Sequence, residues 1–545
     1  MKGVGAVAQV LKLEGVEILF CFPYTPLIDA AAEIGIRPVM ARNEKALCNM
    51  ADGYSRASNG QRIGVIAVQD GPGVENVFGA VAQAFGDSIP VLVLPLGPEQ
   101  RALDVPPEFD SLKSYQNITK FAARINFVDR VPGLMRRAFT MLRAGRAAPV
   151  LLQLPRDVAR AELPDGALEY TPVRGCKSAG DPRAIAEAAR VLLSARIPLL
   201  HVGHGVLWAE AWDELRQLAE LVQAPVMTTM AAKSVFPEDH PLSVGMGANH
   251  MTDAAAHFLK TCDLVFGIGC SFSTVKFSAA IPQGKVMVQI TVDERHLAKD
   301  YPIDVGIIGD AKLVLQQLIQ EVKRQIGVEG RSLEDGPARE IRAIKEAWLE
   351  EWMPKLTSDE VPINPYRVVW DLMHTVDRRE TMVTHDSGNP RDQLAPFYEA
   401  LVPRGYLGWG KSTQLGTSLG LAMGAKLAAP EKLVVNVMGD LAFGMAGMDV
   451  ETAVRERIPI MTVILNNGCL GGYGKAGMPV AGKLYGTHKI TGHYAKVAEG
   501  LGAYSERVQR PEEVVPAIER GIRETERGRA VVLEIITKEE PVFSN

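Results

Sequence analysis

Two apolar runs in the last third of the sequence each end in residue types that could bind a metal ion. The run over 433–438 is followed by Gly439 and Asp440, and the run over 461–465 is followed two residues later by Asn467. Because the carboxyl ends of parallel strands meet at one edge of a sheet, neighbouring strands would bring Asp440 and Asn467 together. A carboxylate, an amide oxygen and a loop carbonyl suit Mg²⁺ that keeps places for phosphate oxygens. Taken singly, the same residue types are also common in turns that end strands.

Short runs rich in Val, Ile and Leu recur along the whole chain, separated by stretches with helical spacing. Continuous apolar strands that alternate with helices are typical of a parallel sheet covered on both faces. The sequence therefore predicts an α/β fold of doubly wound parallel sheets. Strands are expected at 63–68, 91–94, 150–152, 199–202, 264–268, 286–290, 433–438, 461–465 and 531–536.

Two breaks divide the chain into domains. The loop-like segment 170–182 is rich in Pro and Gly, and the charged stretch 329–360 has a helical middle and leads into a Pro-containing segment. We therefore expect three sheet domains and one linker. They are an N-terminal domain over 1–172, a central Rossmann-like domain over 180–330, a charged linker helix over 331–359 and a C-terminal domain over 360–545.

The composition excludes several classes of protein. The 545 residues include 59 Lys and Arg against 64 Asp and Glu, a net charge of −5, so no general basic surface is available for nucleic acid. No apolar run reaches the roughly 18 residues that cross a bilayer, and the first residues lack the apolar segment of a signal peptide. The six cysteines form no CxxC pair. We therefore expect reduced thiols and a cytoplasmic protein.

A second set of motifs lies near the N-terminus. Residues 41–47 (ARNEKAL) and 51–57 (ADGYSRA) are followed by an apolar strand and then by 69–76 (QDGPGVEN). Together with the motifs around Asp440 and Asn467, this order resembles the thiamine-diphosphate enzymes. In that superfamily a pyrimidine-binding domain carries a glutamate, which Glu44 matches, and a diphosphate-binding domain carries Gly-Asp-Gly followed by Asn-Asn. Considered alone, a glutamate in this place is also what a helix N-terminus favours.

The resemblance implies a role for each matching residue. Glu44 would be the catalytic proton relay at the aminopyrimidine of the coenzyme, and Leu415 would be the aliphatic side chain that bends the coenzyme. Mg²⁺ would be held by Asp440, Asn467 and the carbonyl group of Cys469. Further contacts with the coenzyme are expected from Pro23, Gly73, Asn76, Asn389, Thr413, Gly439, Leu441 and Ala442.

Among thiamine enzymes, the chain looks most like the acetolactate synthase group, through 87–90 (DSIP) and 148–158 (APVLLQLPRDV). This likeness implies decarboxylation of a 2-oxo acid and transfer of the resulting acyl-anion unit to an acceptor. The alternatives are a lyase or decarboxylase of 2-hydroxyacyl-CoA or oxalyl-CoA, an aldehyde carboligase, and a non-enzymatic thiamine-binding homologue. In this family the two coenzyme-binding domains of one site come from different subunits, so a homodimer or homotetramer is expected.

Several segments depart from the family pattern. Leu441 stands where Gly, Ala or Ser is usual, and 388–391 (GNPR) replaces Gly-Gln-His-Gln. Segment 270–274 (CSFST) replaces the arginine-bearing segment of the flavin-binding synthases, so FAD is possible but disfavoured. The glycine-rich segment 471–477 could close over a substrate or could be a surface loop.

Overall fold

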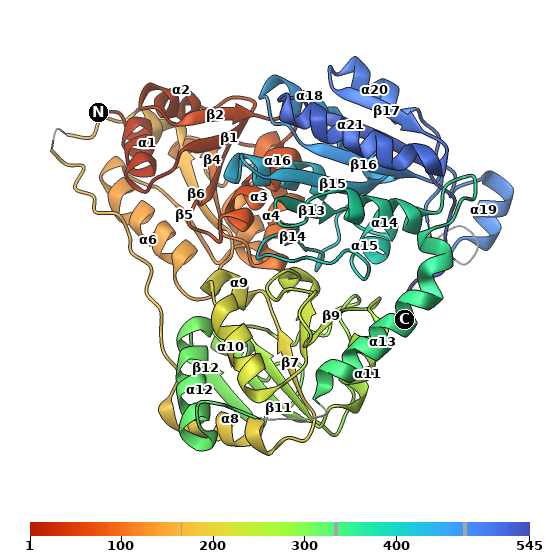
Figure 1. Cartoon of the computed structure of the whole chain (residues 1–545). Coiled ribbons are helices and arrows are strands. Elements are labelled where there is room, and N and C mark those ends of the chain that lie inside the picture. Colours follow the sequence, from red (N-terminus) through yellow and green to blue (C-terminus); the bar gives the residue numbers. More distant parts are fainter. Residues whose placement is uncertain (165, 332–335, 472–476, 545) are drawn as a thin grey trace.

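The computed structural model describes residues 1–164, 166–331, 336–471 and 477–544, and within these ranges the chain forms three six-stranded sheets (Figure 1). All the strands of each sheet are parallel to one another. The α/β fold predicted from the sequence is therefore confirmed. Within the same ranges, no helix combines the length and the apolarity that crossing a membrane requires.

The first sheet has the strand order β2-β1-β3-β4-β6-β5. Its strands are β1 (Ile18–Phe22), β2 (Arg37–Met40), β3 (Gly64–Val68), β4 (Val91–Gly97), β5 (Phe121–Arg124) and β6 (Val150–Pro155). The helices around it are α1 (Gly3–Leu13), α2 (Pro26–Glu33), α3 (Glu44–Ala57), α4 (Pro72–Asp87), α5 (Ser111–Tyr115), α6 (Val131–Arg143) and α7 (Arg156–Arg160). Leu19 and Phe20 are neighbours in β1 but belong to different apolar clusters, because both faces of the sheet are covered.

The central sheet has the strand order β12-β11-β10-β7-β8-β9. Its strands are β7 (Pro198–Val202), β8 (Val226–Thr229), β9 (Ser243–Gly247), β10 (Leu264–Ile268), β11 (Val286–Thr291) and β12 (Val305–Ile308). The helices are α8 (Pro182–Ser194), α9 (Gly205–Ala209), α10 (Trp212–Val222), α11 (Asp253–Thr261) and α12 (Ala311–Ile326). Helix α13 (Pro337–Leu356) then leads to the third sheet, where the ring of Trp348 stacks on that of Phe397 at 4.7 Å between centroids.

The third sheet has the strand order β14-β13-β15-β16-β18-β17. Its strands are β13 (Thr381–His385), β14 (Tyr406–Leu407), β15 (Leu433–Gly439), β16 (Met461–Asn466), β17 (Tyr504–Val508) and β18 (Val531–Ile536). The helices are α14 (Pro365–Thr375), α15 (Asn389–Leu394), α16 (Thr417–Ala428), α17 (Asp440–Ala446), α18 (Val450–Arg455), α19 (Pro479–Tyr485), α20 (Tyr494–Gly500) and α21 (Val514–Glu526). The order reverses between β13 and β15, which is where α/β sheets bind ligands.

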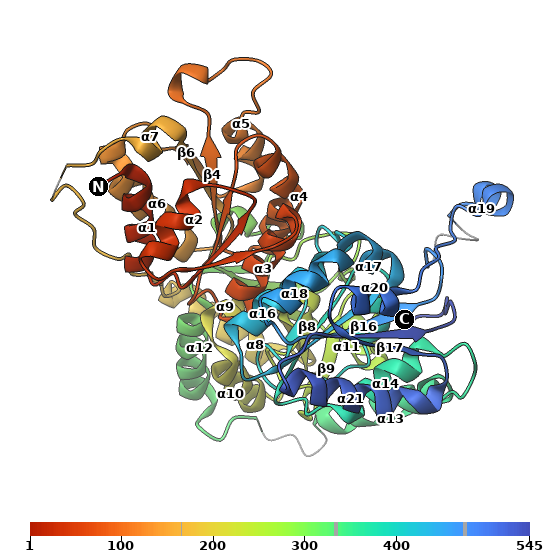
Figure 2. The same cartoon turned by 90° about the horizontal axis from the view of Figure 1, so that it is seen from above.

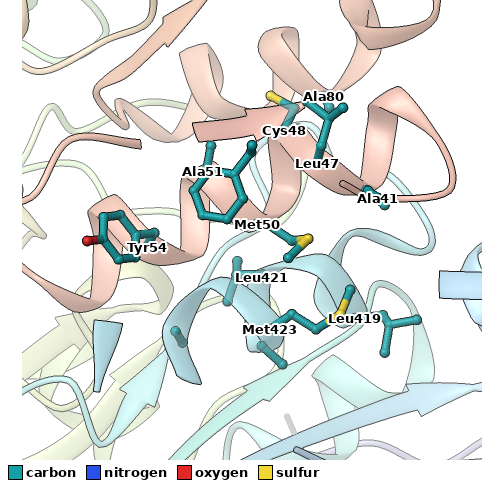
Figure 3. Packing of buried hydrophobic residues seen from close by; sticks show 14 of the residues in the cluster. Ala41, Leu47, Cys48, Met50, Ala51, Tyr54, Ala80, Leu419, Leu421 and Met423 are labelled. Carbon is teal, nitrogen blue, oxygen red and sulfur yellow. The ribbon is translucent and has the colours of Figure 1, made fainter. Parts of the chain in front are cut away.

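Helices α3 and α16 cross at close range and join the first sheet to the third (Figure 2). A Cβ added to Gly424 of α16 would lie 1.9 Å from the carbonyl oxygen of Met50, and one added to Gly53 of α3 would lie 2.0 Å from that of Leu421. Glycine is therefore needed at both positions, because the two backbones touch directly. Met50 and Leu421 lie between the helices in the apolar cluster drawn in Figure 3.

Candidate active site

The carboxyl ends of β15 and β16 bring Asp440 and Asn467 into one cluster of loops. The two strands are parallel neighbours in the third sheet. Asp440 Oδ2 accepts a hydrogen bond from the amide of Gly468 at 2.8 Å, and Asn467 Oδ1 accepts one from the amide of Cys469 at 3.1 Å. The loop that carries Asn467 and Cys469 is thus held against Asp440, as the strand-end argument requires.

The oxygen atoms of this loop cluster suit a hard divalent cation. The Asp440 side chain is buried, and burial raises the pKa of its carboxyl group. A cation would favour the charged carboxylate that burial disfavours. In the part of the chain that the structure describes, no group of three His, Cys, Asp or Glu side chains could hold a metal. A magnesium site here would therefore combine one carboxylate with amide, main-chain and ligand oxygens, as Mg²⁺ sites at phosphates do.

Helix α17 starts at Asp440, and Leu441 and Ala442 form its first turn. The amide of Leu441 donates a hydrogen bond to Asp440 Oδ1 at 2.8 Å, and the Leu441 side chain is half-buried. Ala442 is fully enclosed, and its carbonyl oxygen would lie 3.4 Å from a Cβ added to Gly416. Helix α17 therefore packs against Gly416, the residue that follows Leu415.

Asn389 lies beside the same loop cluster, at the start of α15. Its amide nitrogen would lie 2.2 Å from a Cβ added to Gly471, and the ring of Pro390 would lie 3.7 Å from one added to Gly439. Two of the predicted coenzyme contacts, Asn389 and Gly439, thus lie at the carboxyl edge of the third sheet. Thr413 lies in the loop before α16, with a left-handed φ of 57°.

Leu415 is carried by a loop that a buried carboxylate holds in place. Asp386 directly follows β13 and accepts hydrogen bonds from the amide of Gly416 at 3.0 Å, the amide of Ser418 at 3.0 Å and the hydroxyl of Ser418 at 2.6 Å. Gly416 has a φ of 80°, which favours glycine. Leu415 itself is half-buried against the apolar cluster of α3 and α16.

Glu44 is the first residue of α3 and lies just beyond the carboxyl end of β2. Asn43 caps the helix by accepting a hydrogen bond from the amide of Ala46 at 2.9 Å. The Glu44 side chain is 5% exposed, and its Oε2 accepts a hydrogen bond from the Asn76 side chain at 3.3 Å. The structure thus joins the predicted proton relay to a predicted coenzyme contact on α4.

Pro23 and Gly73 follow β1 and β3, the two strands between which the order of the first sheet reverses. Gly73 lies in the first turn of α4, where an added Cβ would come within 2.9 Å of Gln69 Cγ. Pro23, Gly73 and Glu44 therefore share the carboxyl edge of the first sheet. Ligands of α/β sheets bind at such an edge.

Contacts within one chain already join the two halves of this candidate site. Lys45 Nζ donates a hydrogen bond to the carbonyl oxygen of Leu415 at 2.5 Å, and Asn43 Nδ2 donates one to Asp449 Oδ2 at 2.5 Å. The cleft between Lys45 and Gly416 has a volume of about 10 Å³, room for about one water molecule. The resemblance implied two subunits for one site, whereas this seam lies within one chain and is too narrow for an aromatic ring.

A separate cavity of about 570 Å³ lies among the three sheets. Strands β7 and β10 end at it, and the order of the central sheet reverses between them, as at other ligand sites of α/β sheets. Segment 270–273, which lines one wall, carries no cation; Arg146, Arg391 and Lys411 line other walls. The oxygen atoms that the sequence predicts for a metal site and the glycine predicted to contact phosphate, Gly439, lie at the edge with Asp440 and not among the residues that line this cavity.

Three contact residues of the site did not follow from the sequence. Lys45 stands beside Glu44 in the motif 41–47, and Asp386 follows a buried strand just as Asp440 does. Asp449 had no sequence signal, because its partner Asn43 is distant in the chain. The sequence left open whether the glycine-rich segment 471–477 closes over a substrate or is a surface loop. Residues 472–476 of this segment lie outside the described residues.

Comparison with known protein families identifies three matching domains in the order of the three sheets. Residues 1–118 match the N-terminal TPP binding domain of thiamine pyrophosphate enzymes, where thiamine pyrophosphate is another name for thiamine diphosphate. Residues 185–318 match the central domain of these enzymes, and residues 386–535 match their C-terminal TPP binding domain. Glu44 lies in the first match, and Asp440 lies in the third.

Three known proteins are similar over nearly the whole chain. A probable acetolactate synthase large subunit of Methanocaldococcus jannaschii is 32% identical, with 96% of this chain and 90% of the relative covered. An acetolactate synthase large subunit of Mycobacterium tuberculosis is 29% identical, with coverages of 95% and 85%. A glyoxylate carboligase of Escherichia coli O157:H7 is 30% identical, with coverages of 98% and 93%.

Proposed function

The chain belongs to the thiamine pyrophosphate-dependent enzymes of the acetolactate synthase family, and we propose that it is a Mg²⁺-dependent carboligase that acts on a 2-oxo acid. One observation carries the proposal: Asp440 and the Asn467 loop meet at one sheet edge, and Glu44 lies at the matching edge of another sheet. When bound, the coenzyme would supply a nucleophilic carbon formed by loss of a ring proton. The protein must bind both of its ends, orient it and handle that proton.

We assign the diphosphate end to the loop cluster at β15 and β16. Asp440, the Asn467 side chain and the Cys469 carbonyl would hold Mg²⁺, which would offset the buried charge of Asp440 and bind phosphate oxygens. Asn389 would donate an amide hydrogen bond from α15, next to Gly471. The glycine at the end of β15 leaves backbone amides open to the ligand.

We assign the pyrimidine end to Glu44. Asn76 holds Oε2 of Glu44, so we assign Oε1 as the oxygen that exchanges a proton with the ring nitrogen of the aminopyrimidine. The side chain is buried, which excludes water from that hydrogen bond. Leu415, on a loop fixed by Asp386, would press against the coenzyme and keep its two rings close together.

We propose that a homodimer is the smallest active unit and that a homotetramer is compatible with it. The Lys45–Leu415 contact closes the seam inside one chain, so Glu44 would serve the coenzyme held by a partner chain. Large apolar side chains support a partner surface: Met445 in α17 is 59% exposed, and Met448 just after this helix is 52% exposed.

A complementation assay tests this assignment. Glu44→Gln and Asp440→Asn are each expected to be inactive, because each removes one end of the site. If the sites form between chains, a dimer of one Glu44→Gln chain and one Asp440→Asn chain carries one intact site and one site that lacks both residues. Random reassociation makes about half of the dimers mixed, so about a quarter of the wild-type activity should return. Activity that stays at the level of the separate variants would place both ends of a site in one chain.

Product analysis tests the reaction itself. Incubation with pyruvate, thiamine diphosphate and Mg²⁺ is expected to give CO₂ and acetolactate, with the Asp440→Asn variant as the matched control. The similarity to a glyoxylate carboligase favours a second candidate, in which two glyoxylate molecules give CO₂ and a three-carbon product. Release of CO₂ from glyoxylate but not from pyruvate would replace the first assignment with the second. Turnover of neither substrate would overturn both.

A further inference from the structure

Lys45 makes a contact that no step of the proposed mechanism requires. It follows Glu44 directly in α3, and its ammonium group donates a hydrogen bond at 2.5 Å to the carbonyl oxygen of Leu415. Its side chain is half-buried in the seam between the first and third sheets. The contact thus connects the residue beside the proposed proton relay to the residue proposed to bend the coenzyme.

The position is electrostatically unfavourable for a lysine. Lys45 lies in the first turn of α3, and its partner Leu415 lies two residues before the start of α16 at Thr417. The N-terminus of a helix carries a partial positive charge and disfavours cations. Burial adds to this cost and lowers the pKa of Lys45, while the nearby carboxylate of Asp386 acts in the opposite direction. Local structure alone would therefore favour a neutral or acidic residue.

The loop that carries Leu415 needs anchors because its backbone is unusual. Thr413 and Gly416 both have left-handed φ angles, 57° and 80°. Gln414 is anchored through its side chain to the Gly79 carbonyl at 2.6 Å, and the amide of Gly416 is anchored to Asp386. The hydrogen bond from Lys45 is made to the carbonyl oxygen of the peptide group between Leu415 and Gly416, and the amide of the same group is the one bound to Asp386. A charge-assisted bond to this carbonyl group restricts the direction in which the Leu415 side chain points.

We propose that Lys45 is a positioning residue: it holds the Leu415 carbonyl so that the leucine side chain keeps the bound coenzyme bent. The inference rests on the proposed function, because it concerns the same coenzyme site. Without this hydrogen bond, the loop would still be attached through Gln414 and Gly416, and the coenzyme would still bind. Proton loss from its reacting carbon would slow, because the rings would no longer be held at the distance that transfer requires.

The experiment measures hydrogen–deuterium exchange at the reacting carbon of thiamine diphosphate bound to the full-length protein with Mg²⁺. Lys45→Met is expected to lower the exchange rate about ten-fold, equivalent to about 1.4 kcal/mol in the barrier, at saturating coenzyme. Lys45→Arg, which keeps charge and donors, should recover most of the rate. The matched control is Lys426→Met at the far end of α16, because Lys426 also donates to two carbonyl groups, those of Pro430 and Lys432, and is half-buried.

The outcomes separate this inference from the proposed function. Wild-type exchange no faster than that of free coenzyme would overturn the proposed function and the role of Lys45 with it. Fast wild-type exchange with an equally fast Lys45→Met variant would overturn the role of Lys45 alone, and so would an equal loss in Lys426→Met. If Lys45→Met does not fold, Lys45→Leu replaces it, because it also removes the donor, and an exchange rate equal to that of the wild type would overturn the proposal.

Discussion

Gly424→Ala tests the helix crossing that positions both halves of the site. An alanine Cβ at this position would lie 1.9 Å from the carbonyl oxygen of Met50 and 2.8 Å from the amide nitrogen of Tyr54. A normal contact needs about 3.5 Å, so α3 and α16 would have to separate by roughly 1.5 Å. Overpacking costs about 1–3 kcal/mol, and a clash with rigid backbone belongs at the upper end. Because alanine is better than glycine in a helix by about 1 kcal/mol, we expect a net loss of about 2 kcal/mol.

Thermal unfolding with and without coenzyme measures this loss. About 2 kcal/mol corresponds to a fall of roughly 4–8 °C in the melting temperature of a domain of this size. The control is Gly133→Ala in α6, since Gly133 is exposed and its added Cβ would meet no atom within 4 Å. The control should melt at or above the wild-type temperature. If Gly424→Ala has the same melting temperature as the control, α3 and α16 do not approach as closely as described. The placement of Leu415 beside Lys45 then loses its support.

Four further results follow from the site. Asp440→Asn should weaken Mg²⁺-dependent coenzyme binding at least ten-fold in calorimetric titrations, because the one carboxylate of the proposed metal site is lost; unchanged affinity would remove Asp440 from the site. Burial raises the pKa of Asp440, so Mg²⁺ affinity should fall as the pH decreases through that raised value, at a higher pH than for an ordinary aspartate, and a pH-independent affinity would contradict this. Glu44→Gln should keep most of the coenzyme affinity but lose nearly all exchange at the reacting carbon, as followed by NMR. The purified protein should lack the visible absorption of a flavin, because segment 270–273 has no arginine where the flavin-binding synthases have them; a stoichiometric flavin spectrum would contradict this and would point to Arg146, Arg391 and Lys411 on the other walls as partners of the pyrophosphate.

Nine of the twelve interior strands of the three sheets were predicted from the sequence, but none of the six edge strands was. Strands β10 and β18 occupy the predicted runs 264–268 and 531–536 to the residue. Nine strands were missed, and six of them, β2, β5, β9, β12, β14 and β17, are the edges of the three sheets. Edge strands are covered less completely, so they need no continuous apolar run: β2 is Arg-Pro-Val-Met, and its first and last residues are exposed.

The site divides in the same way, into local and long-range features. Asp440 and Asn467 end consecutive strands, so a rule about strand ends was enough to bring their loops together. The contacts of Lys45 with Leu415 and of Asn43 with Asp449 join residues 370 and 406 positions apart. No spacing in the sequence encodes such pairs, because they depend on how closely α3 and α16 cross. That approach is set by glycines, which carry no chemical signal of their own.

A crystal structure of the protein with thiamine diphosphate and Mg²⁺ tests the central claim most directly. We expect Mg²⁺ at about 2.0–2.1 Å from oxygens of Asp440, Asn467 and Cys469, and the aminopyrimidine within hydrogen-bond distance of a Glu44 carboxyl oxygen from the partner chain. A diphosphate bound elsewhere, for example in the cavity among the three sheets, or a pyrimidine ring without Glu44 beside it, would contradict the account.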